Sequence, residues 1–406
     1  MSQVKKEKCV MLSVVIPAYN EEDGIADIMA RVLAIKPALA AVGVADLELI
    51  VVDDGSSDRT AEIVAATPDV HLVRHETNKG YGAALKTGWC AARGDLLGFL
   101  DADGTYPPEY FPELCRHALD GAELVVGSRR SGDESEMPLV RRIGNFIWST
   151  LVSLLGRERV IDPASGMRVF KREILERIYP LPDGLNLTPV MSTRAIHEGV
   201  KLVEVPIPYR ERVGRSKLNV LRDGSVFLHS IIWTVLTYNP ARILGLLGLA
   251  GIAVAVVVAL GLVGARLSGA TSIGPWGVGA LFIAMVSGVT GISVFALGVT
   301  FNYLVALFNK RPVHQGLFGR PIFDSPLDQH FGWMGLTGIL IGLGLGLFSL
   351  VLGVNGWEIA RLWLYLLGSA MFLLVGVQLV IYFVLLRVLD DLSQREILTR
   401  QDMGTR

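Results

Sequence analysis

Short, continuous apolar runs alternate with segments of helical periodicity over the first half of the chain, from Val10 to about Arg215. Continuous apolar runs are typical of strands buried on both faces of a sheet, and their alternation with helices favours parallel strands. The predicted strands include 10–17, 47–55 and 96–100, and the predicted helices include 22–41 and 58–66. The pattern therefore predicts an α/β domain.

The pattern changes after Asn239 and Pro240, where the chain becomes strongly apolar. Four apolar segments follow, and each is long enough to cross a hydrocarbon layer about 30 Å thick. They cover residues 243–265, 278–308, 333–354 and 362–389. We therefore predict a transmembrane domain of four helices, with helices of a large soluble core as the alternative.

The charges between these segments predict the orientation of the chain. An even number of spans puts both chain ends on one side, and the loop on that same side contains Lys310, Arg311 and Arg320. The opposite loops contain little more than Arg266 and Arg361. Because positively charged loops tend to stay in the cytoplasm, we predict a multi-pass protein of the plasma membrane, inner membrane or an equivalent, with a cytoplasmic α/β domain.

Two further segments are candidates for helices that lie along the membrane surface. Residues 219–239 place apolar side chains at helical spacing, and residues 140–155 are basic at the start and apolar afterwards. Such segments suit the membrane interface, and packing on the sheet is the alternative. The predicted organisation is 1–218 for the α/β domain, 219–239 for the surface helix and linker, 240–392 for the transmembrane domain and 393–406 for a cytoplasmic tail.

The composition supports a membrane protein and excludes several other classes. Of 406 residues, 51% are hydrophobic and 19% are charged, and the mean hydropathy is +0.45. A net charge of -1 argues against nucleic-acid binding, which requires a basic face. The three cysteines have no spacing typical of a disulfide framework or a zinc site. The GxGxxG and GxxxxGK[ST] motifs of dinucleotide oxidoreductases and P-loop NTPases are absent from the sequence.

Two carboxylates follow the predicted strand 96–100 and are the first candidate for chemistry. Asp101 and Asp103 stand where that strand should end, and the ligand crevice of an open α/β sheet lies at the carboxyl ends of its strands. Their spacing lets both approach one hard divalent cation, Mg²⁺ or Mn²⁺, which can in turn hold a diphosphate. A solvated Asp-Gly turn is the alternative for this pair.

Seven motifs in a fixed order resemble glycosyltransferase family 2, whose fold is named GT-A. They are IPAYNEE at 16–22, VDDGSSDRT at 52–60, NKGYGAALKTG at 78–88, DAD at 101–103, GSR at 127–129, DPASGMR at 162–168 and YRERVGRSK at 209–217. The last three resemble the polyprenyl-phosphate branch, typified by dolichol-phosphate mannose synthase. The resemblance implies a GT-A domain with a Rossmann-like mixed sheet, followed here by surface helices and the four spans.

The resemblance also implies which residues hold a nucleotide sugar. Pro17, Ala18 and Tyr19 stand at the carboxyl end of the first strand, where a loop can hold a flat base, and Glu21 can accept hydrogen bonds from base or ribose. The resemblance assigns Asp53 to the nucleoside, Asp101 and Asp103 to the metal and the catalytic centre, and Arg212 and Lys217 to the donor diphosphate. A glutamine that often follows the two aspartates in relatives is replaced here by Gly104, Thr105 and Tyr106.

An acceptor phosphate needs fork-shaped guanidinium groups, which bind phosphate through two hydrogen bonds. By resemblance the candidates are Arg129 and Arg141, with Asn145 where relatives commonly have serine; Arg212 is a further candidate. Asp162 is expected to line the reaction centre, where it orients an arginine or acts as a base. A turn or helix-capping aspartate is the alternative for Asp162.

The resemblance implies an inverting transfer of a hexose from a UDP- or GDP-linked sugar to undecaprenyl or dolichyl phosphate at the cytoplasmic face. A processive polysaccharide synthase is one alternative, although the QxxRW element of such enzymes is absent from the sequence. A noncatalytic membrane scaffold or lipid-sugar flippase is another. The expected partners are the nucleotide sugar, the polyprenyl phosphate lipid and the membrane, without nucleic acid; a homo-oligomer and the identity of the sugar stay open.

Overall fold

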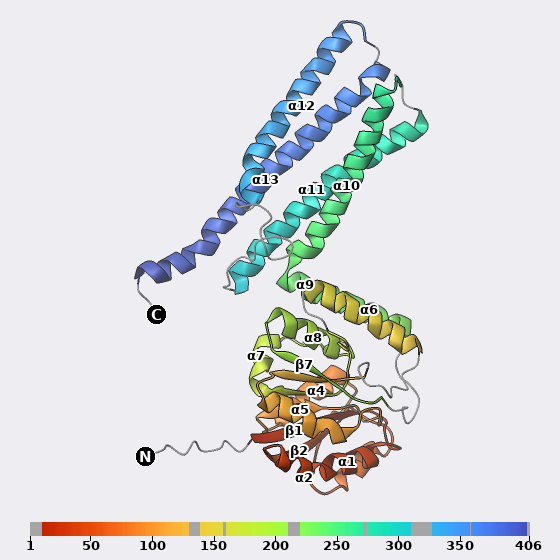
Figure 1. The fold of residues 1–406 in the computed structure, drawn as a ribbon, viewed down its shortest axis with the longest axis vertical. Helices are drawn as coiled ribbons and strands as arrows, with labels where there is room; N and C mark the ends of the chain where they lie inside the picture. Colours follow the sequence, from red (N-terminus) through yellow and green to blue (C-terminus); the bar gives the residue numbers. More distant parts are fainter. Residues whose placement is uncertain are drawn as a thin grey trace. The chain divides into compact units, whose positions relative to one another are not determined.

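The computed structural model describes residues 10–129, 139–156, 160–209, 220–270, 274–309, 327–357 and 359–403. The chain divides into two units, Met1–Val235 and Leu236–Arg406. Figure 1 shows the elements of each unit.

The described part of the first unit forms a sheet of seven strands in the order β3-β2-β1-β4-β6-β5-β7. The strands are β1 (Val10–Ala18), β2 (Val44–Asp53), β3 (Val70–Arg74), β4 (Leu96–Phe99), β5 (Leu124–Ser128), β6 (Arg168–Lys171) and β7 (Leu202–Pro206). β6 runs antiparallel to both of its neighbours, β4 and β5, whereas the other pairs are parallel. The sheet is therefore mixed, which confirms the fold class expected from the family resemblance.

The helices of this unit cover both faces of the sheet. They are α1 (Ile25–Ala34), α2 (Lys36–Ala41), α3 (Thr60–Ala65), α4 (Tyr81–Ala91), α5 (Phe111–Leu119), α6 (Leu139–Gly156), α7 (Leu175–Ile178), α8 (Leu187–His197) and α9 (Val220–Tyr238), with 3-10 turns at Pro108–Tyr110 and Arg172–Ile174. The helix predicted over 22–41 is divided into α1 and α2, because Pro37 lies in the first turn of α2 and has no N–H for a continuous helix.

The core consists of two apolar layers, one on each side of the sheet. Val14 and Ile16 of β1 pack in the layer that contains Met29 of α1, together with residues of α5. Val15 points to the opposite face and packs in the layer that contains Trp89 of α4, together with residues of α8. Because successive side chains of a strand alternate between faces, β1, whose residues are apolar apart from Ser13, packs against both helix layers.

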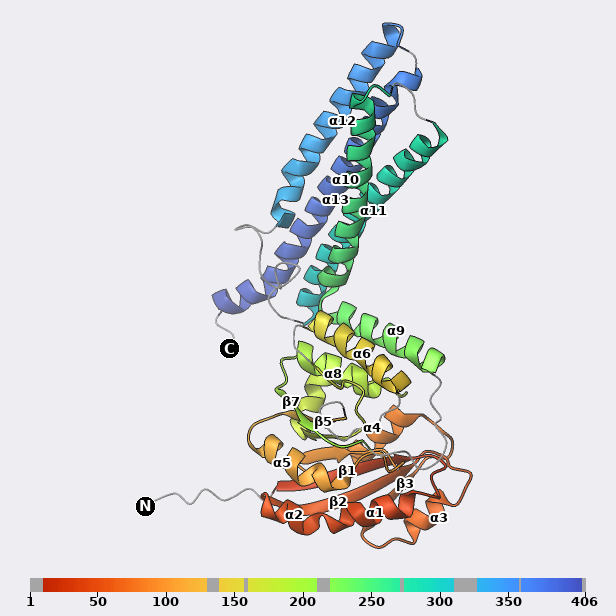
Figure 2. The same cartoon turned by 45° about the vertical axis from the view of Figure 1, so that its right-hand side comes forward.

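Helices α6 and α9 lie side by side in both views (Figures 1 and 2). The Trp148 and Phe227 rings, one from each helix, have centroids 6.1 Å apart. Both predicted amphipathic segments are thus helical. Their position at a membrane surface stays a prediction.

The second unit contains α10 (Pro240–Leu267), α11 (Pro275–Asn309), α12 (Phe331–Val354) and α13 (Ile359–Met403), with a 3-10 turn at Leu327–His330. Among the described residues, four helices are long and apolar enough to cross a membrane, as predicted. α10 packs on α11, α12 on α13, and α11 on α13. Close approach of α10 and α11 depends on Gly248, where a Cβ atom would lie 2.6 Å from the carbonyl oxygen of Gly291.

The C-terminal helix extends further than the predicted last span. α13 continues to Met403, so most of the segment predicted as a tail, 393–406, is helical. Between α11 and α13, the Gln378 amide donates to the Ser293 hydroxyl, which is a polar contact inside the predicted membrane domain. Lys310, Arg311 and Arg320, on which the predicted orientation depends, lie outside the described residues.

Candidate active site

The two aspartates of the DAD motif follow the end of β4 and are held by side chains close to them. The Tyr81 hydroxyl donates to Asp101 Oδ1 at 2.8 Å. The Thr105 N–H and hydroxyl donate to Asp103 Oδ1 at 3.1 and 2.6 Å. These donors are neutral, so they orient the carboxylates without supplying a positive charge to them.

The loop that carries the DPASGMR motif lies against the same aspartates. A Cβ atom at Gly166 would overlap the Asp101 carboxylate, so any other residue at this position would displace that carboxylate. The Gly166 N–H donates to the Tyr106 hydroxyl at 2.6 Å. The approach of this backbone to Asp101 brings residues 162–166 to the carboxyl end of β4.

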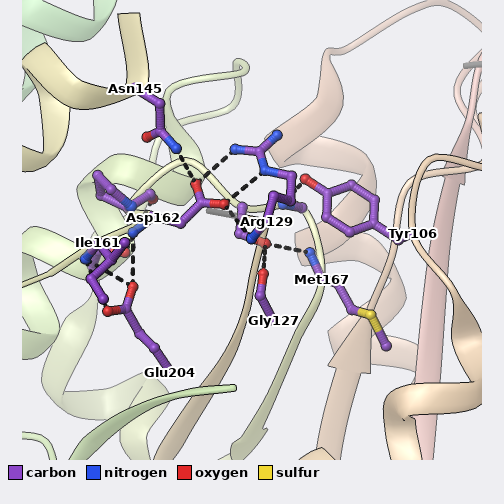
Figure 3. A network of polar contacts seen from close by, with 12 residues as sticks. Tyr106, Gly127, Arg129, Asn145, Ile161, Asp162, Met167 and Glu204 are labelled. Carbon is purple, nitrogen blue, oxygen red and sulfur yellow. Dashed lines mark hydrogen bonds and ion pairs between the residues drawn. The ribbon is translucent and has the colours of Figure 1, made fainter. Parts of the chain in front are cut away.

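Asp162 is the centre of a buried polar network (Figure 3). Its side chain is 0% exposed and accepts two hydrogen bonds at 2.7 Å from the Arg129 guanidinium, through Nε and Nη2. It also accepts from the Arg129 N–H at 3.0 Å and from the Asn145 amide at 2.8 Å. Four donors occupy both carboxylate oxygens, which favours the prediction that Asp162 orients an arginine over the prediction that it acts as a base.

The charge states in this network follow from its geometry. Burial alone would raise the pKa of Asp162, but the charge and hydrogen bonds of Arg129 lower the pKa below its ordinary value. Burial likewise opposes the charged form of Arg129, but the Asp162 carboxylate raises the arginine pKa. The two side chains therefore form an ion pair at neutral pH.

Glu204 of β7 supports the same loop from the other side. Its carboxylate accepts from the N–H groups of Ile161 at 2.9 Å and Asp162 at 2.8 Å (Figure 3). Burial raises the pKa of Glu204, and these two hydrogen bonds oppose that change. No pattern in the sequence predicts a role for Glu204, because a glutamate in a short strand has no local feature that indicates a contact with a distant loop.

Arg168, at the start of β6, is the last residue of the DPASGMR motif, and the sequence alone assigned no role to it. Its side chain is completely buried, and it donates to the carbonyl oxygens of Ser165 at 3.1 Å and Pro163 at 2.7 Å. Burial lowers the pKa of Arg168 to about 10. The signal available in the sequence was an arginine that ends the DPASGMR motif and directly precedes the apolar pair Val169 and Phe170.

The loops after β1 and β2 are joined at the predicted nucleoside site. Asp53 ends β2 and accepts from the Ser56 N–H at 3.0 Å and from Arg74 Nε at 3.1 Å. Asn20 Oδ1 accepts from the Ser57 N–H at 2.8 Å, which ties the two loops together. Tyr19 is 38% exposed beside them, so its ring is accessible to a ligand.

Most of the predicted site residues follow strands that run in the same direction, so they lie at the same edge of the sheet. Pro17 and Ala18 end β1 and pair with Val52 and Asp53 of β2, and Tyr19 and Glu21 follow them. Arg129 follows β5, and Asn145 of α6 reaches Asp162. The side chain of Arg141, and all of Arg212 and Lys217, lie outside the described residues.

The donor set at Asp101 and Asp103 fits a hard divalent cation, because carboxylate oxygens are the ligands that Mg²⁺ and Mn²⁺ prefer. Within the described part of the chain, no group of three or more histidine, cysteine, aspartate or glutamate side chains is arranged to hold a metal. Two protein carboxylates leave coordination positions for ligand oxygens, as a cation that bridges to a diphosphate requires.

Two family models match the chain. The first, "Glycosyl transferase family 2", matches residues 13–179. The second, "Domain of unknown function (DUF8752)", matches residues 240–400. The first match contains Asp162, Arg129, Asn145 and the DAD motif but not Glu204, and the second contains the four long apolar helices.

The chain is similar to curated transferases. It is 34% identical over 221 residues to a dolichyl-phosphate hexose transferase of Haloferax volcanii, covering 54% of this chain and 92% of the relative. It is 32% identical to an undecaprenyl-phosphate 4-deoxy-4-formamido-L-arabinose transferase of Photorhabdus laumondii subsp. laumondii, covering 61% of this chain and 72% of the relative. Among solved structures, glucosyl-3-phosphoglycerate synthase from Mycobacterium tuberculosis is 27% identical, with 56% of this chain and 78% of that chain covered and a TM-score of 0.44, which is too low to establish a shared fold.

Proposed function

Because this chain belongs to the polyprenyl-phosphate branch of glycosyl transferase family 2, we propose that it transfers one hexose from a UDP- or GDP-linked sugar to polyprenyl phosphate. The curated relatives are named for transfer to dolichyl phosphate and undecaprenyl phosphate. The products of the proposed reaction are a polyprenyl-phosphate sugar and a nucleoside diphosphate.

One observation carries the proposal: a single loop contacts both halves of the site. Gly166 lies against the Asp101 carboxylate, and Asp162, four residues earlier, holds the Arg129 guanidinium. An acidic group suited to a cation and a basic group suited to a phosphate monoester thus lie at the two ends of one short segment. A donor diphosphate and an acceptor phosphate are two anions, and this arrangement offers each a binding group of its own.

The donor half is proposed to hold the nucleotide sugar. Tyr19 and Glu21 would contact the base or ribose, and Asp53 the nucleoside, while Arg212 and Lys217 would contact the diphosphate. A divalent cation, Mg²⁺ or Mn²⁺, bound at Asp101 and Asp103 would neutralise the charge that develops on the leaving diphosphate.

The acceptor half is proposed to present the lipid phosphate to the anomeric carbon. A phosphate oxygen forms the new bond to that carbon from the side opposite the diphosphate, whose bond to the carbon breaks, so the configuration inverts. The attacking oxygen is already anionic near neutral pH, so no strong general base is required. Asp162 serves this step by fixing the plane of the Arg129 guanidinium, with Arg141 and Asn145 as further contacts.

The lipid acceptor requires access to a membrane, and α6 and α9 are proposed to provide it. Phe146 and Ile147 of α6 are 58% and 53% exposed, and Trp233 of α9 is 56% exposed. Exposed aromatic and aliphatic side chains on adjacent helices suit insertion at the boundary of headgroups and acyl chains. The proposed location of the catalytic unit is the cytoplasmic face, on the basis of the loop charges.

The test is a transfer assay with the full-length protein in lipid nanodiscs. Radiolabelled UDP- and GDP-hexoses are supplied with and without polyprenyl phosphate, and the organic phase is counted. The proposal expects lipid-soluble label that depends on both polyprenyl phosphate and a divalent cation. Label in a water-soluble polymer would favour a processive synthase, and no transfer from any of the sugars would favour a scaffold or flippase; either result contradicts the proposal.

A further inference from the structure

A tyrosine at the start of α4 contacts the first aspartate of the DAD motif. Tyr81 is the first residue of α4, and its hydroxyl donates to Asp101 Oδ1 at 2.8 Å. Burial and the neighbouring Asp101 carboxylate raise the pKa of Tyr81 well above its ordinary value, so the phenol stays a neutral donor. With Gly166 on its other side, the Asp101 carboxylate has little freedom to turn.

The position of Tyr81 depends on the turn that precedes it. Gly80 has a φ of +102°, which is unfavourable for other residues, and a Cβ atom there would lie 2.6 Å from the carbonyl oxygen of Asp183. The N–H groups of Lys79 and Gly80 donate to the two oxygens of Asp54, at 2.9 and 2.8 Å. The buried Asp54 carboxylate therefore sets the direction in which α4 begins.

A buried histidine holds Asp54 and α4 together. His75 Nδ1 lies 2.7 Å from Asp54 Oδ1, and His75 Nε2 lies 3.0 Å from the Thr87 hydroxyl on α4. His75 is 6% exposed and Asp54 is 3% exposed. Because a carboxylate accepts hydrogen bonds, the Nδ1 N–H of His75 donates to Asp54, and the other ring nitrogen is bonded to the Thr87 hydroxyl.

We propose that Tyr81 is a positioning residue that orients Asp101 toward a divalent cation, and that the His75–Asp54 pair acts through Tyr81 by fixing the start of α4. Side chains that hold a metal ligand in one orientation commonly change metal affinity or activity about 10- to 100-fold when they are removed. The inference rests on the proposed function in one respect, namely that a divalent cation binds at Asp101 and Asp103. Binding of that cation can be measured without sugar transfer.

The first experiment measures Mn²⁺ binding to the full-length protein with UDP or GDP, by electron paramagnetic resonance of free Mn²⁺. Tyr81→Phe removes one hydroxyl, and we expect Mn²⁺ affinity to fall about 10-fold with an unchanged melting temperature. The matched control is Tyr179→Phe, which removes a hydroxyl from an exposed ring and is expected to leave Mn²⁺ affinity unchanged. Affinity of Tyr81→Phe within about twofold of wild type would overturn the proposal.

The second experiment tests whether His75 acts through Tyr81. His75→Leu removes both contacts, whereas His75→Asn keeps a donor near the position of Nδ1. We expect His75→Leu to weaken Mn²⁺ binding more than His75→Asn does, and to add almost nothing in the Tyr81→Phe background. Additive losses in the double variant would contradict the indirect role, because residues that act through one contact do not contribute independently.

The proposed function and this inference fail in different ways. If no sugar is transferred but Tyr81→Phe still weakens Mn²⁺ binding, the positioning role holds and the proposed reaction is wrong. If transfer occurs but Tyr81→Phe binds Mn²⁺ as wild type does, the reaction stands and the positioning role is wrong.

Discussion

At the residue scale, Asp101 and Asp103 accept hydrogen bonds from the hydroxyls of Tyr81 and Thr105, neither of which carries a charge. Asp101→Asn and Asp103→Asn should each abolish transfer. The cation would lose a ligand, and the leaving diphosphate would then lose several kcal/mol of stabilisation by the cation. Initial rates with Mg²⁺ or Mn²⁺ test this, and circular dichroism checks that the fold is kept. Near-normal turnover in either variant would exclude the DAD motif as the metal site.

Arg129 and Asp162 form a buried pair, so removing the arginine alone leaves an unpaired buried carboxylate. Arg129→Ala should therefore lower the free energy of unfolding by about 3 to 5 kcal/mol. It should also weaken binding of polyprenyl phosphate while nucleotide binding changes little. Thermal unfolding and calorimetry with nucleotide alone measure the two effects separately.

The control for this variant is the double change Arg129→Met with Asp162→Asn, which removes both charges. It should recover most of the lost stability, since no buried charge is left unpaired. Recovery of acceptor binding is not expected, because the guanidinium fork is absent. If nucleotide binding falls as far as acceptor binding in Arg129→Ala, the arginine serves the donor diphosphate instead.

The lowered pKa of Asp162 predicts how stability depends on pH. Its folded-state pKa lies below the unfolded value of about 4, so its contribution is complete above about pH 4 and is lost as the pH falls through the folded value. Below about pH 4, the free energy of unfolding should fall more steeply with decreasing pH in wild type than in Asp162→Asn. Between pH 5 and 8, the Arg129–Asp162 ion pair should not make the free energy of unfolding depend on pH. Melting temperatures of both proteins across this range check the sign.

At the scale of elements, α6 and α9 expose apolar side chains on the catalytic unit. Phe146→Ser and Trp233→Ser should each raise the apparent KM for polyprenyl phosphate in vesicles roughly 10- to 150-fold, because each variant loses about 1.5 to 3 kcal/mol of apolar burial. Nucleotide binding should be unchanged. The matched control is Leu119→Ser, at a 40% exposed position of α5. If Leu119→Ser raised the KM equally, α6 and α9 would have no specific role in access to the lipid.

The sequence predicted some elements well and missed others for a physical reason. The apolar run 96–100 located β4, because a strand buried on both faces has a continuous apolar signal, and the DAD motif follows directly. β6 has only four residues and begins with the buried Arg168, so its antiparallel insertion between β4 and β5 depends on tertiary contacts that no local pattern contains. The Arg129–Asp162 pair joins residues 33 positions apart, and only the folded chain brings them together.

At the scale of the whole molecule, the four spans predict opposite sides for two loops. A protease site inserted within 268–274 should be cut only from outside the cell, and one within 311–319 only from the cytoplasmic side. The reason is the excess of basic residues in the second loop. Cleavage of both sites from the same side would mean that one of the four helices does not cross the membrane.

In the proposed reaction one hexose is transferred to one lipid phosphate, so the mass of the lipid product is the decisive measurement. After incubation of the full-length protein with the preferred nucleotide sugar and polyprenyl phosphate of one chain length, the lipid is extracted and analysed by mass spectrometry. Transfer of a single hexose gives one new species, heavier than polyprenyl phosphate by one hexose and absent when EDTA is added. A ladder of products with increasing numbers of hexoses, or an unchanged lipid, would contradict it.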